Sequence, residues 1–130
     1  MKMAYDGQLL TATLTISYRG KTLQLTDIII DTGSSHTIFS PDVLEDIGVT
    51  YENGDTVYEA YGIGGTMPFY TKVLDYIQID TLQIEHIEID VGMLPNSHKG
   101  LLGLDILKAY GFIVDMNKLE LHLSLSALDT

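Results

Sequence analysis

Apolar and polar side chains alternate along residues 8–18, which predicts a β-strand with one buried face. The apolar set is Leu10, Ala12, Leu14, Ile16 and Tyr18, with threonine or serine between them. Arg19-Gly20-Lys21 has the composition of a tight turn, and residues 22–30 return as a second strand. The last three residues of that strand are isoleucines. The predicted hairpin therefore leads an apolar strand directly to Asp31.

Two short helices are expected. Ser40-Pro41 is typical of a helix start, because serine caps the first turn and proline fits the first helical position. This helix is expected over residues 41–47 and should end at Gly48, since glycine is favoured just beyond a helix. The second helix is expected over residues 104–110, with Gly111 as its stop.

Further strands are predicted by short apolar or alternating runs. They are residues 36–40, 55–61, 66–79, 82–91, 101–102, 112–115 and 119–125. The apolar phase slips near Glu85-His86, which predicts a bulge or a short break. The final strand alternates strictly, so its leucine face must be covered by the core or by a second chain. We find no repeat or linker and expect one all-β domain over residues 1–130.

Composition narrows the function classes. The formal net charge is −11, which disfavours nucleic acid and anionic lipid as partners. No apolar run reaches the ~18 residues that a membrane-spanning helix needs, so no membrane partner is expected. The N-terminal residues lack the apolar segment of a secretory signal, and a cytoplasmic location is expected.

The sequence offers no obvious metal site. It contains no cysteine, which excludes disulfides and thiolate ligands. The histidines, at positions 36, 86, 98 and 122, are not spaced as close metal ligands. We therefore expect neither a metal ion nor another cofactor.

The turn after the second strand carries the candidate chemistry. Asp31 follows three isoleucines and precedes Thr32, Gly33, Ser34 and Ser35. A carboxylate at the end of a buried strand loses hydration, which is costly unless hydrogen bonds or a shared proton compensate. The glycine permits close approach of the backbone, and hydroxyl and backbone N–H groups can donate to the carboxylate. This pattern predicts a site rather than a surface loop.

Asp31-Thr32-Gly33-Ser34-Ser35 resembles the catalytic signature of aspartic peptidases of the pepsin and retropepsin kind. Leu101-Leu102-Gly103 resembles the apolar pair and glycine that these enzymes carry downstream, and residues 104–108 resemble the short helix that follows. Gly62-Ile63-Gly64-Gly65 lies where a retropepsin flap would be. The match is closest to small bacterial relatives and to the retropepsin-like domains of DNA-damage-inducible proteins. It implies a closed, all-β retropepsin-like barrel with one or two short helices and a glycine-rich flap hairpin.

The resemblance also implies a homodimer. Peptide hydrolysis by carboxylates needs two of them close together, and this chain has one suitable aspartate. Asp90-Val91-Gly92 fails as a second triplet because it lacks hydroxyl side chains. Each protomer is therefore expected to contribute one Asp31. Two charges ~3 Å apart repel by roughly 5 kcal/mol at a dielectric near 20, so the pair must share a proton, and an acidic pH optimum is expected.

By the same resemblance, neighbouring residues have expected roles. Thr32 should reach the matching turn of the partner, and Gly33 should offer its carbonyl to the substrate. The Ser34 hydroxyl should donate to Asp31, and Thr37 matches a position that often bears a hydroxyl. The residues expected to contact an extended peptide are Ser35, His36, Gly62, Ile63, Gly64 and Gly65.

The sequence departs from the retroviral enzymes at three points. Those enzymes commonly have alanine at the place of Ser34, an acidic pair at the place of Ser35-His36, and arginine at the place of Leu104. Retroviral-style ion pairing near the dimer interface is therefore not expected, and the substrate pocket should differ.

Several alternatives stay open. The glycine-rich tip could be an ordinary hairpin turn, whereas a phosphate-binding loop is disfavoured because no Lys-Ser/Thr and no helix follow it. The favoured function is a homodimeric aspartic endopeptidase. The alternative is a non-catalytic retropepsin-fold domain for dimerisation or peptide binding, and a plain structural barrel leaves the ordered motifs unexplained.

Overall fold

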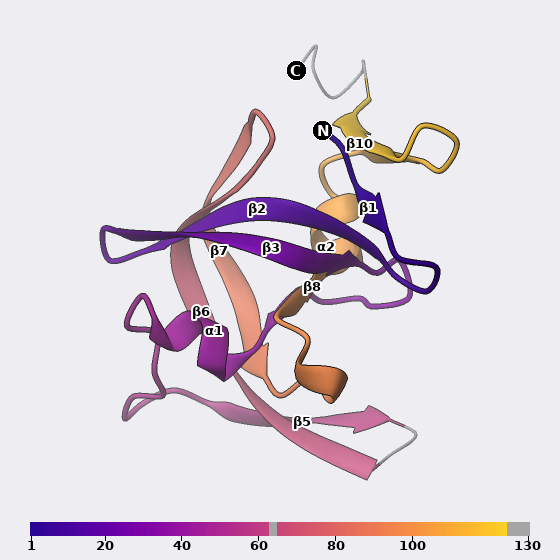
Figure 1. Ribbon diagram of the computed structural model, residues 1–130. Helices are drawn as coiled ribbons and strands as arrows, with labels where there is room; N and C mark the ends of the chain where they lie inside the picture. Colours follow the sequence, from indigo (N-terminus) through magenta and orange to yellow (C-terminus); the bar gives the residue numbers. More distant parts are fainter. Residues whose placement is uncertain (63–64, 125–130) are drawn as a thin grey trace.

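The computed structural model describes residues 1–62 and 65–124, and its regular structure is mainly β-strand (Figure 1). The strands are β1 (Ala4–Tyr5), β2 (Leu10–Tyr18), β3 (Lys21–Ile30), β4 (Ile38–Phe39), β5 (Val57–Gly62), β6 (Gly65–Ile79), β7 (Leu82–Gly92), β8 (Gly100–Leu102), β9 (Phe112–Asp115) and β10 (Glu120–Leu123). The helical segments are α1 (Pro41–Glu45), the single 3-10 turn η1 (Pro95–Ser97) and α2 (Leu104–Leu107). The expected all-β class with two short α-helices is confirmed.

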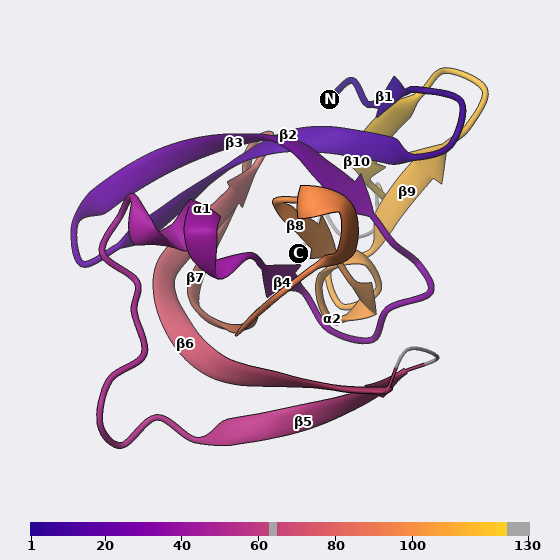
Figure 2. The ribbon, with the colours of Figure 1, turned by 60° about the horizontal axis from the view of Figure 1, so that its bottom comes forward.

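Six strands close into a barrel. The strand order is β2-β3-β8-β4-β7-β6, and β6 pairs back onto β2 to complete the ring. Most neighbours are antiparallel, but β3 runs parallel to β8 and β4 runs parallel to β7. The two short strands β4 and β8 lie side by side in the middle of the molecule in Figure 2. Both parallel pairs therefore lie next to the turn that follows β3.

The alternation along β2 faces the core as predicted. Ala12, Leu14, Ile16 and Tyr18 are all buried, and Ile16 is completely so. The core is completed by aliphatic side chains from β3, β6, β7, β8 and α2, and fully buried members include Ile28, Leu74, Ile77, Leu102 and Ile106. Burial of this apolar surface is the main force that closes the barrel.

The predicted caps are present, although both helices are shorter than expected. The Ser40 side chain accepts a hydrogen bond from the Asp42 N–H, and Pro41 occupies the first turn of α1. Gly48, at φ +81°, takes the left-handed conformation that ends the segment. Because the chain turns after Glu45, α1 stops before the expected residue 47. In the same way α2 ends at Leu107, and Gly111 follows at φ +67°.

The phase slip in β7 is a break without an extra residue. Leu74 pairs with Ile87 and Tyr76 pairs with Glu85, while the register between β6 and β7 stays constant. His86 adopts a left-handed φ of 51°, so β7 changes the face that it buries there. The alternative of a bulge with one inserted residue is thereby excluded on this strand.

The β5–β6 hairpin extends beyond the barrel (Figure 2). Pairing runs from Val57 with Tyr70 to Gly62 with Gly65. Ile63 and Gly64, which the sequence assigns to the flap tip, lie outside the described residues. The glycine-rich hairpin itself is confirmed as a structural element.

Both ends of the described chain lie together. β9 and β10 form a separate hairpin, and Lys2 forms an isolated bridge with Glu120 beside it. The backbone of Met1 also exchanges hydrogen bonds with Leu121. No helix in the described ranges is long and apolar enough to cross a membrane.

Candidate active site

Asp31 lies at the end of β3, between the barrel and solvent. Its backbone N–H donates to the Leu102 carbonyl at 3.0 Å, which ties the start of the turn to β8. Oδ1 of Asp31 accepts the Gly33 N–H at 2.9 Å. The side chain is half-buried, whereas the preceding Ile30 is buried. The carboxylate is thus fixed on the backbone side and open on the other.

The turn after Asp31 is closed by its own hydrogen bonds. The Ser34 N–H donates to the Asp31 carbonyl at 3.3 Å, and the Leu104 N–H donates to the Ser34 carbonyl at 2.8 Å. Thr32 and Ser35 are exposed. The end of β8, through the Leu102 carbonyl, and the start of α2, through the Leu104 N–H, therefore both hold the turn.

The expected bond from Ser34 to the Asp31 carboxylate is not present, and this prediction was wrong. The Ser34 hydroxyl donates to the His36 carbonyl at 2.8 Å and accepts the His36 N–H at 3.4 Å. The chain curls back after the glycine, so the His36 backbone is the nearer partner. Ser34 therefore stabilises the turn locally.

A buried threonine and an aspartate support the turn from below. Thr37 is completely buried, its N–H donates to one oxygen of Asp105 at 2.9 Å, and its hydroxyl donates to the other at 2.7 Å. The same hydroxyl accepts the Gly103 N–H at 3.1 Å. Sequence reasoning marked Thr37 and missed Asp105, which stands 68 residues away.

Gly103 allows the segment after β8 to lie directly against the backbone of His36, in the turn that follows Asp31. A Cβ built on it would lie 2.5 Å from the His36 carbonyl oxygen and 2.6 Å from the His36 carbonyl carbon. Backbone atoms cannot move aside as a flexible side chain can. A side chain at this position would therefore push the Asp31 turn away from β8 and α2.

A cavity of about 410 Å³ separates the turn from the β5–β6 hairpin. Its lining consists of Gly33, Ser34, Ser35, His36, Ile38, Glu59, Ala60, Met67, Pro68, Phe69, Asp90, Gly92 and Met93. Four of the expected site residues, Gly33 to His36, therefore share one hollow with the hairpin arms. Gly65, at the described end of the hairpin, is not among these lining residues.

Asp31 lines a second hollow, of about 440 Å³. Its other residues come mainly from the segment around the start of β2, from the end of β3 and from the η1 loop, with Leu101 of β8 among them. The Asp31 turn therefore borders two concave regions, one at Asp31 and one at Gly33 to His36.

Asp90, rejected as a catalytic residue, lines the first cavity. Its side chain is 9% exposed, and Oδ2 lies 3.4 Å from Nδ1 of His36. Burial raises the pKa of the Asp90 carboxyl, and the nearby imidazole offsets part of that rise. An acidic residue within an apolar strand is unusual, and it was the one sequence signal of this pairing.

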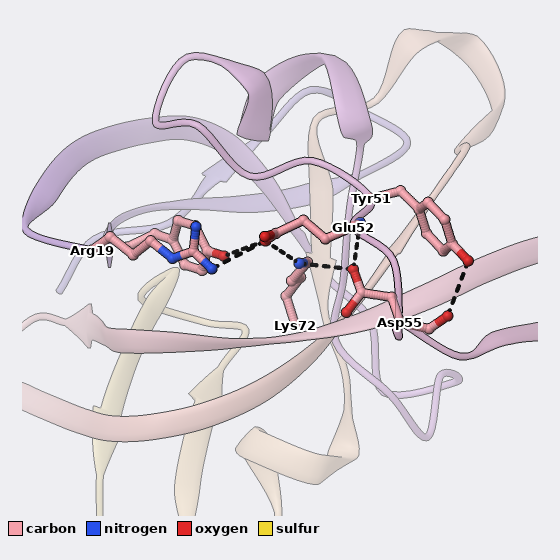
Figure 3. A network of polar contacts seen from close by, with 6 residues as sticks. Arg19, Tyr51, Glu52, Asp55 and Lys72 are labelled. Atoms are coloured by element: carbon pink, nitrogen blue, oxygen red, sulfur yellow. Dashed lines mark hydrogen bonds and ion pairs between the residues drawn. The ribbon is translucent and has the colours of Figure 1, made fainter.

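A second charged group lies at the base of the β5–β6 hairpin (Figure 3). We call Arg19, Glu52, Asp55 and Lys72 the hairpin-base cluster. Lys72 Nζ lies 2.8 Å from Glu52 Oε1 and 2.8 Å from Asp55 Oδ2, and Arg19 reaches the same Glu52 oxygen at 3.0 Å.

The charges of the hairpin-base cluster balance one another, because its two cations pair with its two carboxylates. Burial lowers the pKa of the Lys72 ammonium, but hydrogen bonds to Asp55 and Glu52 outweigh it and raise that pKa overall. The hydrogen bond from Lys72 also holds the pKa of Glu52 and of Asp55 below their ordinary values. Each carboxylate therefore stays ionised at neutral pH.

Within residues 1–62 and 65–124, no group of three or more potential ligands could hold a metal ion.

Comparison with known proteins agrees with this geometry. Residues 12–106 match the aspartyl protease family, which covers most of the chain and both motifs. The chain therefore belongs to the aspartyl protease family. No curated protein matches the sequence significantly.

Solved structures resemble the chain in fold. A retropepsin-like aspartic protease from Rickettsia conorii has a TM-score of 0.62 at 16% identity, covering 86% of this chain and 89% of its own. The retroviral protease-like domain of Ddi1 from Leishmania major has a TM-score of 0.63 at 16% identity, covering 90% and 89%. EIAV protease, solved with the inhibitor HBY-793, has a TM-score of 0.60 at 19% identity, covering 83% and 94%. The fold is retropepsin-like, as the sequence resemblance predicted.

Proposed function

We propose that this protein is a homodimeric aspartic endopeptidase. The observation that carries the proposal is the Asp31 turn, whose carboxylate accepts the Gly33 N–H and is half-buried, and whose residues Gly33 to His36 line the cavity under the β5–β6 hairpin. Membership of the aspartyl protease family supports it. One chain supplies one such carboxylate, so two protomers would provide the pair that the reaction needs.

The reaction follows from two carboxyl groups that share one proton, as in aspartic proteases. The ionised Asp31 takes a proton from a water molecule, and the water oxygen attacks the carbonyl carbon of the peptide. The protonated Asp31 of the second protomer gives its proton to the carbonyl oxygen. The first Asp31 then gives the proton it took from water to the nitrogen, the C–N bond breaks, and the second Asp31 recovers a proton from a hydroxyl of the collapsing tetrahedral diol. The products are a carboxylic acid and an amine.

Substrate would lie between the turn and the β5–β6 hairpin. The 410 Å³ cavity is lined from below by Gly33 to His36 and from above by Met67 to Phe69, so a peptide strand would contact both. In this proposal Thr32 contacts the partner's turn, Gly33 offers its carbonyl, and the hairpin tip closes over the peptide. Hydrogen exchange in β5 and β6 should slow when a statine-type inhibitor binds.

The decisive experiment replaces the catalytic carboxylate. Asp31→Asn should reduce cleavage of an unfolded protein substrate at mildly acidic pH by at least about 100-fold, because general acid–base catalysis is lost. Its thermal unfolding should stay close to that of the wild type. The matched control is Asp27→Asn, an exposed position on the same strand, which should cleave normally.

Dilution tests the dimer. Specific activity should fall when the protein is diluted below its dimerisation constant, and light scattering should show the protomer appearing over the same range. Full activity of a monomer across the whole range would contradict the two-carboxylate mechanism. An inert but dimeric wild type would favour the non-catalytic binding domain.

A further inference from the structure

Asp90 is held rigidly at the wall of the cavity next to the catalytic turn. Its N–H donates to the Thr37 carbonyl at 3.0 Å, and it pairs with Ile38 of β4 on one side and Thr71 of β6 on the other. Both neighbouring strands therefore fix the backbone from which the carboxylate projects. Its side chain is 9% exposed and lines the 410 Å³ cavity.

The surroundings leave this carboxylate without a permanent counter-ion. Among the described residues, the basic group beside it is the imidazole of His36 at 3.4 Å, and that side chain is itself 64% exposed. The other nearby charges, Asp105 and Glu88, are also acidic. Glu59, on β5, adds a further carboxylate to the lining, which contains no lysine or arginine. A buried carboxylate in such a place gains from a cation brought by a ligand.

We propose that this cavity is a substrate subsite that takes a lysine or arginine side chain, with Asp90 as the residue that determines the preference. The inference rests on the proposed peptidase function, since it describes how the same cleft selects its peptide. The cationic end of the substrate side chain pairs with Asp90 and displaces the exposed imidazole of His36.

The rest of the lining fits the stem of such a side chain. Ile38, Met67, Pro68 and Phe69 provide apolar surface in the same lining as the Asp90 carboxylate. Lysine and arginine bury their methylene groups along surfaces of this kind while the charged end reaches a polar partner. The volume of about 410 Å³ falls in the range of roughly 300–1,000 Å³ typical of ligand pockets.

Binding to the Asp31→Asn variant tests the subsite without turnover. We would measure, by calorimetry at pH 7, a series of eight-residue peptides in which one lysine is moved through the positions. Each peptide has a matched partner with norleucine, which has a similar stem without the charge. At one position the lysine peptide should bind about tenfold more tightly, which corresponds to about 1.4 kcal/mol.

Two substitutions locate the cause of that preference. Asp90→Asn keeps the shape of the side chain and should remove the lysine preference while leaving norleucine binding unchanged. Glu88→Gln removes the same charge two residues away, at an exposed position outside the cavity lining, and should retain the preference. Thermal unfolding of each variant checks that it is folded.

Several results would overturn the proposal. These are equal binding of lysine and norleucine peptides at every position, a lysine preference that survives Asp90→Asn, and an equal loss in Glu88→Gln. The first comparison needs no change at position 90, so it holds even if a variant fails to fold. Cleavage of both peptide series at equal rates would remove the subsite and keep the peptidase. Lysine-selective binding by a wild type that cleaves nothing would remove the peptidase and keep the subsite.

Discussion

The partners of carboxylate groups differ between two regions of this molecule, the hairpin-base cluster and the surroundings of the Asp31 turn. In the hairpin-base cluster, Glu52 and Asp55 share the buried ammonium of Lys72. Near the Asp31 turn, Asp90 lies beside an exposed imidazole, and Asp105 accepts hydrogen bonds from the Thr37 N–H and hydroxyl. One region is neutralised by fixed cations, and the other is not.

The difference separates a structural role from a chemical one. A carboxylate that is permanently paired with a buried lysine cannot easily change its protonation or partner. A carboxylate beside an exposed imidazole can exchange that partner for a ligand cation. The cluster in Figure 3 therefore joins the hairpin base to the β2–β3 turn, whereas Asp90 has no fixed cation beside it among the described residues and can pair with a ligand.

The largest expected effect comes from Gly103→Ala, which should displace the Asp31 turn and leave the hairpin-base cluster unchanged. The new Cβ would meet the His36 backbone at 2.5 Å, so the Asp31 turn must shift. We expect kcat/KM to fall at least about 100-fold and stability to fall by about 3 kcal/mol. The control is Gly54→Ala, which has open space but a φ of +100°, and should lose about 1 kcal/mol without losing activity. Normal activity in Gly103→Ala would show that the turn tolerates displacement.

Thr37→Val tests the neutral support of the same turn. Valine keeps the shape but leaves the Gly103 N–H and one oxygen of Asp105 without the hydroxyl. We expect a loss of about 1–3 kcal/mol in chemical unfolding, because a buried polar group is left unsatisfied. Thr37→Ser retains the hydroxyl and should recover most of the loss. Equal stability of the valine and serine variants would mean that the hydroxyl contributes little.

Lys72→Met removes the buried ammonium of the hairpin-base cluster and tests how the stability that it provides depends on pH. The pKa values of Glu52 and Asp55 are lowered from ordinary values of 4.5 and 3.8, chiefly by the hydrogen bond from Lys72. Groups with lowered pKa contribute stability above those ordinary values, and the contribution is lost as the pH falls through the lowered ones. At pH 7 we expect the variant to melt about 4 °C below the wild type.

The acid range separates a charge effect from a packing effect. The gap in melting temperature between wild type and Lys72→Met should narrow as the pH falls below 4.5 and through the lowered pKa values of Glu52 and Asp55, because both carboxylates of the wild type lose their charge there. A gap that stays constant down to pH 2.5 would mean that lost packing of the lysine stem, and not its charge, causes the destabilisation.

The smallest effect is expected at the exposed edge of the hairpin-base cluster. Arg19 is 66% exposed and contacts Glu52 at 3.0 Å. Exposed ion pairs contribute little, so Arg19→Ala should shift the melting temperature by no more than about 2 °C. A larger shift would indicate that Arg19 is coupled to the buried Lys72, which a double variant could measure.

Local patterns predicted local structure well. The alternation of β2 and the Ser40-Pro41 cap depend on neighbours in sequence, and both are found. The closed barrel came from the resemblance, because strand order around a ring is not encoded in the period of any one strand. The bond from Thr37 to Asp105 spans 68 residues and has no sequence signature.

Two site residues show why sequence reasoning failed there. Ser34 was assigned to Asp31, but the hydroxyl turns to the His36 carbonyl, which only the folded turn brings within 2.8 Å. Asp90 was set aside because its triplet lacks hydroxyl groups, which is a statement about catalysis alone. Its position beside His36 depends on β4 lying parallel to β7, and a single strand cannot reveal that.

The parallel pairing of β3 with β8 also has a kinetic consequence. Ile29 pairs with Leu101, so this contact can form only after the long intervening segment has been brought back to the first hairpin. Hairpins such as β2–β3 and β5–β6 close within microseconds, whereas contacts so distant in sequence require a much greater loss of chain entropy. We expect the hairpins to form first during refolding and the β3–β8 pairing, which positions Asp31, to form late. Recovery of catalytic competence should therefore lag behind recovery of strand content when the protein refolds from denaturant.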